Sequence, residues 1–448
     1  MLTLENARTA AERLVDDAVR AGADAADVLY AGNRSTSIHV RLGKLEDVSR
    51  SEAEEIGLRV FVGARSASVA SSDLSAEALR ELVSRAVAMA EQAPEDPFAG
   101  LAPADRLASA PFPNLDSTDP VEPDLADLRE RALTAESVAL GVAGVTNSSG
   151  GSAGASGSTI ALATSSGFAG AYSATGFSCS AGVIAGEGGS MQRDHAWHSA
   201  RHLSDLDKAD EIGRLAGTRA VARLNPVRPK SGPMPVLFDP RVSHTLLGHL
   251  AGAISGSSVA RKSSFLQDKL GERIFAEGVA IIDDPLRPRG LRSRPFDGEG
   301  LVVERNEIVV DGVLRTWMAE SASARQIGIA PTGHASRGVG SAPGVSPSNF
   351  YMAAGARSRE ELLAAFPEAL LVTELIGQGI NGVTGDYSRG AAGFLVRNGE
   401  IGAAVEEITI ASNLIDMFAN LEPASDLELR RGIDAPTLLI PEMTVGTA

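Results

Sequence analysis

The chain has one cysteine, Cys179, in 448 residues, and only 4% of its residues are aromatic. A single thiol excludes an internal disulfide framework and is typical of a reducing compartment. No stretch approaches the ~20 apolar residues of a membrane-spanning helix, and the first residues have neither the basic start nor the apolar run of a secretion signal. We therefore expect a soluble, cytoplasmic protein without a membrane segment.

Positively charged residues are also fewer than negatively charged ones, and the formal net charge is −16. No basic stripe offsets the repulsion from phosphate, which argues against a nucleic-acid partner. A phosphate-binding loop is absent, since no Gly-x-x-x-x-Gly-Lys occurs. The glycine and serine stretch around Ser156 lacks the complete pattern of a serine nucleophile elbow.

Residues 1–95 show the pattern of an α-β-β-β-α unit. Apolar residues recur at helical spacing over 5–22 and 74–93, and between them lie strand candidates at 27–30, 38–42, 57–62 and 67–70. The strands follow one another closely, with Gly63 at a turn, which predicts an antiparallel meander packed against two helices.

Residues 96–230 form a middle region that we expect to continue the N-terminal domain. A proline-rich connector is followed by helices over 124–140 and 206–224. The segment 147–158 has the composition of a flexible linker, and because strand candidates flank it we favour a long hairpin loop over an interdomain hinge. Three histidines within 195–202 could share a helical face and a metal, but solvated histidines on an edge strand explain them better.

A proline-rich stretch at 226–235 predicts a domain boundary, so that 231–448 forms a second domain. Strand candidates at 277–284, 301–304, 307–312 and 370–375 make this domain β-rich with a few helices. Asp239-Pro240 predicts a helix start, Gly248, Gly252 and Gly256 form a stripe that would let another backbone approach, and a second helical pattern follows residue 264. The fold class is α+β.

Two stretches carry a resemblance to a known family. GHLAGAISGSSVARKSSFLQDKLGERIF at 248–275 and VTELIGQGINGVTGDYSRGAAGFLVRNGEI at 372–401 resemble the PmbA (TldE) branch of the TldD/PmbA family, and the resemblance spans nearly the whole chain. It implies a cytosolic two-subunit metallopeptidase that trims or degrades peptides, including microcin precursors. The TldD branch carries a His-Glu-x-x-x-His zinc motif and a cysteine ligand near its C-terminus.

The corresponding residues here are incomplete for zinc chemistry. His244 and His249 fill both histidine positions, but Thr245 stands where the catalytic glutamate would be, and the C-terminal segment has no cysteine. Metal-assisted hydrolysis needs about three protein ligands and a nearby base. Two side chains five residues apart on a helix also diverge by about 140°. We therefore assign no catalytic residue, keep His244 and His249 as weak metal candidates, and expect no cofactor in this chain.

Two loops of the C-terminal domain could contact a peptide or a partner subunit. One contains His334, and the other contains Asp386 and Arg389 among glycines that leave backbone amides accessible. The structural alternative is a local ion pair between Asp386 and Arg389 that orders the turn.

Three functions remain open. The resemblance implies a catalytically impaired subunit that pairs with a zinc-bearing TldD-like subunit, or forms a homodimer without it, and acts on short or unfolded peptides. The alternatives are an autonomous metallohydrolase using His244, His249 and a third ligand such as His334 or Asp386, and a peptide-binding adaptor without hydrolysis.

Overall fold

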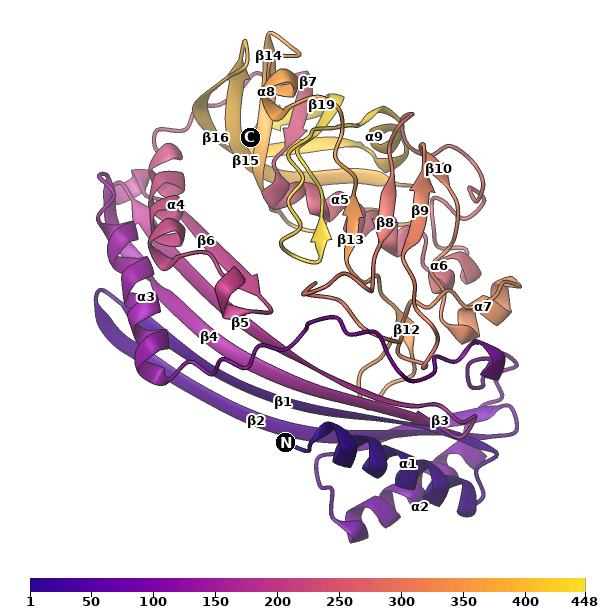
Figure 1. Ribbon diagram of the computed structural model, residues 1–448. Helices are drawn as coiled ribbons and strands as arrows, with labels where there is room; N and C mark the ends of the chain where they lie inside the picture. The colour runs from indigo at the N-terminus through magenta and orange to yellow at the C-terminus, as the bar shows by residue number, and fades with distance from the viewer. Residues whose placement is uncertain (448) are drawn as a thin grey trace.

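The computed structural model describes residues 1–447, and its first half is built on one long, curved antiparallel sheet (Figure 1). The sheet has the strand order β3-β2-β1-β4-β5-β6. Its strands are β1 (Ala25–Arg41), β2 (Lys44–Val62), β3 (Arg65–Ser71), β4 (Val145–Thr164), β5 (Ala169–Ala185) and β6 (Gln192–Ala200). Residues from 1–95 and from 96–230 therefore share a single sheet.

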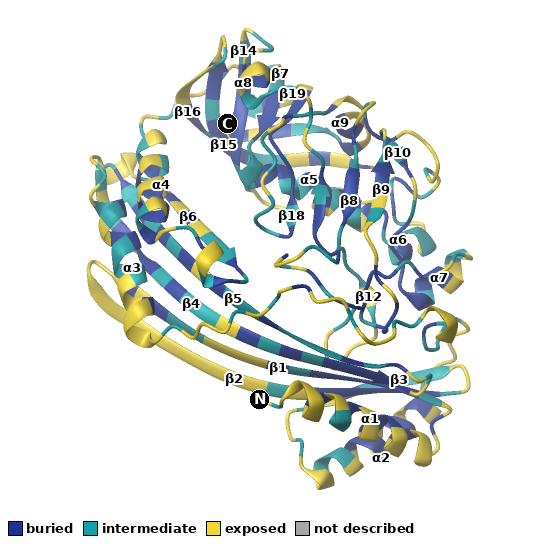
Figure 2. Cartoon of the chain, in the orientation of Figure 1, coloured by how far each residue is buried: buried dark blue, intermediate teal, exposed yellow. Residues whose placement is uncertain are grey.

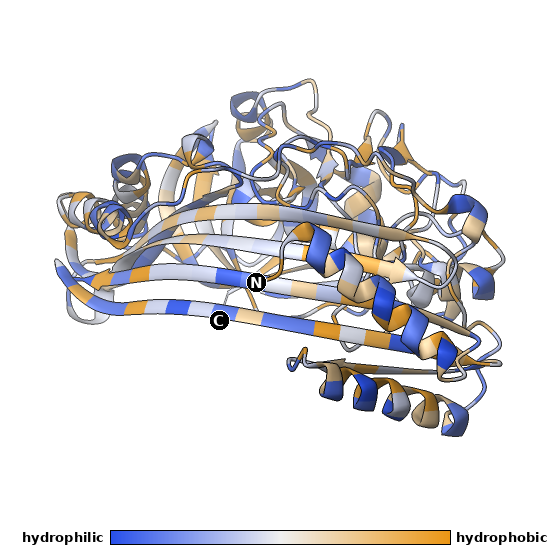
Figure 3. Ribbon diagram, turned by 60° about the horizontal axis from the view of Figure 1, so that its bottom comes forward, coloured by the Kyte–Doolittle hydropathy of each residue, from blue (hydrophilic) through white to orange (hydrophobic). Residues whose placement is uncertain are grey.

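Two pairs of helices cover opposite ends of this sheet. They are α1 (Leu4–Arg20) and α2 (Ala76–Gln92) at one end, and α3 (Leu125–Leu140) and α4 (Ala209–Ala222) at the other. Figure 3 shows α1 and α2 against one end of the strands. The interfaces are lined mainly by alanine, valine and leucine, so helices and strands approach closely.

The second half lies over the concave side of the long sheet (Figure 1). It contains a six-stranded sheet of order β16-β15-β14-β7-β19-β17, in which β16 also pairs with β19 and so closes the sheet on itself. These strands are β7 (Gly232–Phe238), β14 (Glu368–Ile376), β15 (Asp386–Arg397), β16 (Glu400–Asn413), β17 (Glu422–Pro423) and β19 (Leu438–Thr447).

A smaller sheet and several helices complete this half. The small sheet consists of β10 (Val313–Leu314), β9 (Asn306–Val310), β8 (Ile281–Asp283), β13 (Phe350–Met352) and β18 (Ile433–Asp434), and β11 (Ala335–Ser336) pairs separately with β12 (Gly344–Val345). The helices are α5 (Pro240–Ala253), α6 (Gly256–Ala260), α7 (Ser321–Ile327), α8 (Arg359–Leu363) and α9 (Leu414–Asn420). The α+β class with a β-rich C-terminal part is confirmed.

Three local expectations were wrong. The stretch 147–158 is neither a loop nor a hinge, because it lies within β4. Its glycines serve close packing: a Cβ on Gly151 would lie 2.4 Å from the carbonyl oxygen of Ala132 on α3. The strand candidates at 27–30 and 38–42, by contrast, are confirmed up to Arg41 and lie in one continuous strand, β1. The helical pattern after residue 264 folds as turns, and 301–304 makes only an isolated bridge at Leu301.

The glycine stripe runs from α5 to the first residue of α6 and behaves differently along its length. A Cβ on Gly256 would meet the Ser323 side-chain oxygen at 2.5 Å, so close approach occurs there. A Cβ on Gly248 or Gly252 would meet no atom within 4 Å. The face of α5 that carries these two residues is therefore open. Elsewhere the outer part of β2 is exposed (Figure 2), and no helix within 1–447 is long and apolar enough to cross a membrane.

Candidate functional site

The strand β7 leads directly into α5, and this junction positions the candidate site. The Asp239 carboxylate caps the helix by accepting the backbone N–H of Arg241 at 3.0 Å, and Pro240 occupies the first turn, where no N–H is missed. The buried face of α5 packs through Val242, Leu246 and Leu250 into the core between the two C-terminal sheets. Its other side faces a cavity.

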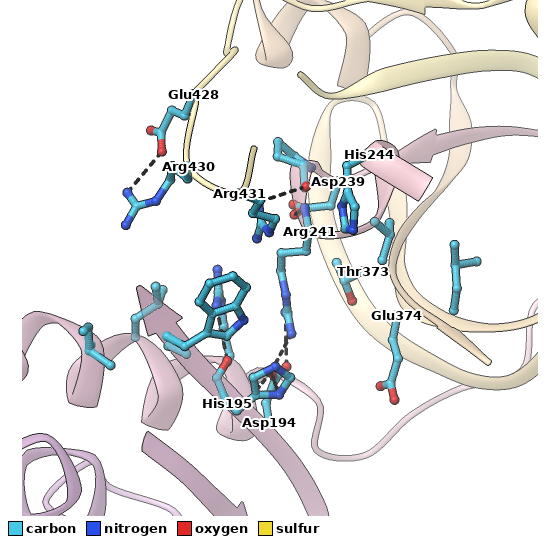
Figure 4. Close-up of a pocket in the computed structure, with 18 of the residues that line it drawn as sticks. Asp194, His195, Asp239, Arg241, His244, Thr373, Glu374, Glu428, Arg430 and Arg431 are labelled. Atoms are coloured by element: carbon cyan, nitrogen blue, oxygen red, sulfur yellow. Dashed lines mark hydrogen bonds and ion pairs between the residues drawn. The ribbon is translucent and has the colours of Figure 1, made fainter. Parts of the chain in front are cut away.

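This cavity of 1020 Å³ lies between the two halves of the molecule. Its walls come from β6 and α4 on one side and from α5, β14 and the loop 426–431 on the other. Figure 4 shows Arg241 and Arg431 entering this space from the C-terminal half, opposite Asp194 and His195 on β6. Arginine is the most frequent charged residue of the lining.

One buried carboxylate, Asp194, ties the two walls together. Its oxygens accept hydrogen bonds from both terminal nitrogens of Arg241, at 2.6 and 3.2 Å, and lie 3.7 Å from Arg223. Arg223 also pairs with Glu374 at the end of β14. A paired Arg–carboxylate fork of this kind fixes geometry as well as charge. Arg223 and Arg241 are thus neutralised by acidic neighbours.

Four other arginines that line the cavity, Arg193, Arg219, Arg389 and Arg431, lack such a neighbour among residues 1–447. Within residues 1–447, neither Arg219 nor Arg431 has a carboxylate oxygen within 4.0 Å. Arg219 donates only to the backbone oxygen of His195, at 3.3 Å, and Arg431 donates to that of Pro240, at 3.4 Å. Burial, and then the charge of Arg241, lower the pKa of Arg219 to about 10. Both side chains remain cationic at neutral pH.

The residues at the position of the zinc motif lie at and behind this wall. His244 lines the cavity, and burial, followed by the charge of Arg431, lowers its pKa. The Thr245 hydroxyl donates to the Val242 carbonyl at 2.6 Å, so its proton is used within the helix. A hydroxyl held in this way cannot replace a glutamate as a general base.

His249 belongs to a separate, more apolar environment. Its ring contacts the Tyr387 ring edge to face at 6.1 Å, and Tyr387 is only 1% exposed. Burial, and then the nearby Arg389, lower the pKa of His249 to about 4. Its Nε2 atom and the Tyr387 hydroxyl are buried without a hydrogen-bond partner among the described residues.

These residues do not fit a zinc ion. Within 1–447, no three His, Cys, Asp or Glu side chains gather where they could hold a metal. The charges of Arg431 and Arg389 act on His244 and His249, so a divalent cation there would be repelled. Cys179 is buried on β5, and burial raises its pKa to about 11, which disfavours the thiolate that a metal requires.

The structure separates the other predicted residues. His334 is buried at 1% exposure, with Nδ1 2.8 Å from the Thr332 hydroxyl, and is not placed to touch a peptide. The expected ion pair of Asp386 with Arg389 is wrong, because Asp386 instead accepts from Thr384 and Asn413 and fixes the turn. Arg389 points along the same face of β15 as Tyr387 and lines the cavity.

Sequence reasoning missed Asp194, Arg219 and Arg431. They come from β6, α4 and a C-terminal loop, and only the tertiary fold brings them together. The histidines within 195–202 do lie on an edge strand, but Asp194 beside them is the residue that organises the site. A buried acid that contacts arginines on other elements cannot be recognised from a short stretch of the sequence.

The chain is similar to one group of proteins along almost its whole length. Residues 26–90, 118–224 and 231–447 match domain 1, the central domain and the C-terminal domain of PmbA/TldA metallopeptidases. It is 39% identical to the metalloprotease PmbA of Escherichia coli over 94% of this chain and 92% of that protein. It is 35% identical to a PmbA homologue of Haemophilus influenzae, over 98% and 95%.

Solved structures share this architecture. A Bacteroides thetaiotaomicron protein described as a modulator of DNA gyrase superposes with a TM-score of 0.92 at 27% identity, covering 100% of both chains. TldE from Thermococcus kodakarensis superposes with a TM-score of 0.86 over 98% of this chain and all of that one. At 20% identity the second likeness concerns the fold alone.

Proposed function

Since this chain belongs to the PmbA/TldD metallopeptidase family, on its PmbA branch, we propose that it is the subunit without zinc in a cytoplasmic two-subunit peptidase. A TldD-like partner supplies the zinc ion and the general base, and the complex processes or degrades short or unfolded peptides. The observation that carries this proposal is the state of α5: Thr245 occupies the base position and Arg431 lies beside His244.

Zinc would supply a polarised water as the nucleophile, and this chain offers no group to activate it. Its own residues perform other tasks. The Asp194–Arg241 pair holds the two walls of the cavity in register, and the open face of α5 leaves room for a peptide or a segment of the partner. A metal-free subunit of this kind shapes the compartment in which the partner cleaves the peptide, and it excludes water from that compartment.

Reconstitution tests this proposal. The purified chain is mixed with a TldD-like chain, association is followed by size-exclusion chromatography with light scattering, and cleavage of a short peptide is measured. We expect a hetero-oligomer that cleaves faster than either chain alone. A His244→Ala/His249→Ala double variant should cleave like the unmodified complex, with His39→Ala, an exposed histidine on β1, as the control. Absence of association, or cleavage unchanged by adding this chain, would remove the proposal.

One observation favours a second candidate. His244 Nδ1 and His249 Nε2 are both buried without a hydrogen-bond partner among the described residues, a state that a metal would relieve. An autonomous metallohydrolase would then use these two histidines. It requires cleavage by the isolated chain that is lost in His249→Ala. A peptide-binding adaptor, the third possibility, predicts tight binding of peptides that remain intact even with the partner present.

A further inference from the structure

We propose that the cavity between α4, β6 and α5 binds a carboxylate carried by an apolar peptide segment, and that Arg219 and Arg431 receive it. The choice of a peptide as the ligand rests on the proposed function. The carboxylate is either the peptide's C-terminus or an acidic side chain, since both present the same two oxygens.

The carboxylates near these two arginines already have partners. Asp194 is shared by Arg241 and Arg223. Asp239 caps α5 and pairs with Arg359 at 2.7 Å. Asp434 accepts the backbone N–H groups that begin the turn at residues 431–432, at 2.9 and 3.0 Å. The positive charge of Arg219 and Arg431 is therefore left for a group that is not part of this chain.

The two arginines line the same cavity as Arg241. The charges of Arg241 and Arg431 lower the pKa of Arg219, while those of Asp194 and Asp239, which are already paired elsewhere, raise it. A guanidinium presents two parallel N–H donors that match a carboxylate. An anion bound between Arg219 and Arg431 would relieve their repulsion. It would also accept hydrogen bonds from guanidinium N–H groups that now make only long hydrogen bonds to backbone oxygens, of 3.3 and 3.4 Å.

Apolar side chains at the same cavity indicate what the carboxylate is attached to. Trp197 is 42% exposed and Leu215 is 44% exposed, and both line the cavity. The Arg431 guanidinium lies 5.5 Å from the centre of the Trp197 ring, so the indole holds the cation at the boundary between polar and apolar surface. A ligand with one negative end and an apolar body fits this arrangement, whereas a multiply charged anion would also face Asp194 and Glu374.

Calorimetric titration of the full-length chain with matched peptides tests the site. The probes are the tetrapeptide Ala-Leu-Leu-Phe with a free C-terminal carboxylate and the same peptide with an amidated C-terminus. We expect the amidated form to bind about tenfold more weakly, because it loses a charge-assisted hydrogen bond. Arg219→Gln and Arg431→Gln should each weaken the free-acid peptide about tenfold and leave the amidated peptide unchanged.

Arg214→Gln is the matched control, because Arg214 lies on the exposed face of α4, outside the cavity. Amidated Ala-Leu-Leu-Glu separates the two sources of carboxylate: recovered affinity supports the site and assigns it to a side chain, while no recovery assigns it to the C-terminus. Equal affinity for the free and amidated peptides overturns the proposal without requiring any variant to fold. The titration uses neither partner nor zinc, so its failure would leave the two-subunit proposal standing, and the reverse also holds.

Discussion

The two halves of the molecule meet at two charged regions that are built on opposite plans. In the first, Asp27 on β1 lies directly opposite Arg59 on β2 and also pairs with Arg337 from the C-terminal half, and all three side chains are at most 7% exposed. Burial raises the pKa of Asp27, but the two guanidiniums outweigh it and hold that pKa below its usual value. In the second, the cavity, Arg219 and Arg431 have no carboxylate.

The difference teaches that arginine in a protein interior has two uses. Where a carboxylate from the same chain is in place and water is excluded, the arginine fastens one segment to another. Where the acidic neighbours are already paired and the side chain lines a cavity, as at Arg219, the arginine is available to a ligand. Removing a partner from the first kind of region should be costly, and removing an arginine from the second should not.

Asp27→Asn is the change with the largest expected effect. It removes the anion shared by the buried guanidiniums of Arg59 and Arg337, of which Arg59 keeps only Glu299 at 4.0 Å, so we expect the free energy of unfolding to fall by about 3–5 kcal/mol. Chemical denaturation against the exposed control Asp47→Asn measures it. If both variants unfolded at the same denaturant concentration, the ion pairs of the first region would not hold the two halves of the molecule together.

Glu299→Gln should have a smaller effect than Asp27→Asn, with a defined pH dependence. Burial, and then the Asp297 carboxylate, raise the pKa of Glu299 to about 7. Because the folded-state pKa lies above the ordinary value, stability is highest at acid pH and is lost as pH rises towards 7. The variant should be more stable than the wild type above pH 7, by about 1–3 kcal/mol.

The measurement for Glu299 is denaturation at pH 5 and at pH 8, beside the exposed control Glu304→Gln. The difference between Glu299→Gln and the wild type should be larger at pH 8. A difference that is the same at both pH values, or larger at pH 5, would contradict the account.

His249→Gln should show a pH effect of the opposite sign. The pKa of His249 is lowered to about 4, below its ordinary value near 6.5, so the stability that it contributes is present above pH 6.5 and is lost as pH falls towards 4. The variant should lose less stability than the wild type over this interval, as followed by thermal unfolding. His39→Gln should retain the wild-type profile, and a His249→Gln profile identical to it would contradict the prediction.

Arg219→Met should have the smallest effect. No carboxylate within 1–447 loses a partner, and only a 3.3 Å hydrogen bond to a backbone oxygen disappears, so stability should change by less than about 1 kcal/mol. Arg337→Met is its counterpart in the first region and should cost about 3–5 kcal/mol. Equal losses in the two variants would erase the distinction between the two regions.

Much of the fold could be predicted from local signals. The Asp239-Pro240 pair marks the start of α5, and the helices at 4–20, 76–92 and 125–140 follow from apolar spacing. The β4 strand could not be predicted in this way, because its glycine and serine composition has low strand propensity, and at Gly151 only a glycine permits the close approach of α3. Packing against the face of the sheet determined the conformation of that segment.

The site divides along the same line. His244, Thr245 and His249 could be identified because they stand in one helical motif. The pairing of Asp194 with Arg241 depends on two elements 47 residues apart, and the isolation of Arg219 depends on which acids are already bound elsewhere. Which charged residues pair with one another depends on the tertiary fold, so a local sequence pattern cannot predict it.

Metal content is the measurement that tests the central claim most directly. Elemental analysis is made on the isolated chain and on its complex with a TldD-like chain, using the same samples that determine size. The account predicts no zinc in the isolated chain and one zinc per pair in the complex. One zinc per isolated chain, lost in the His244→Ala/His249→Ala double variant, would contradict it and place the metal on α5.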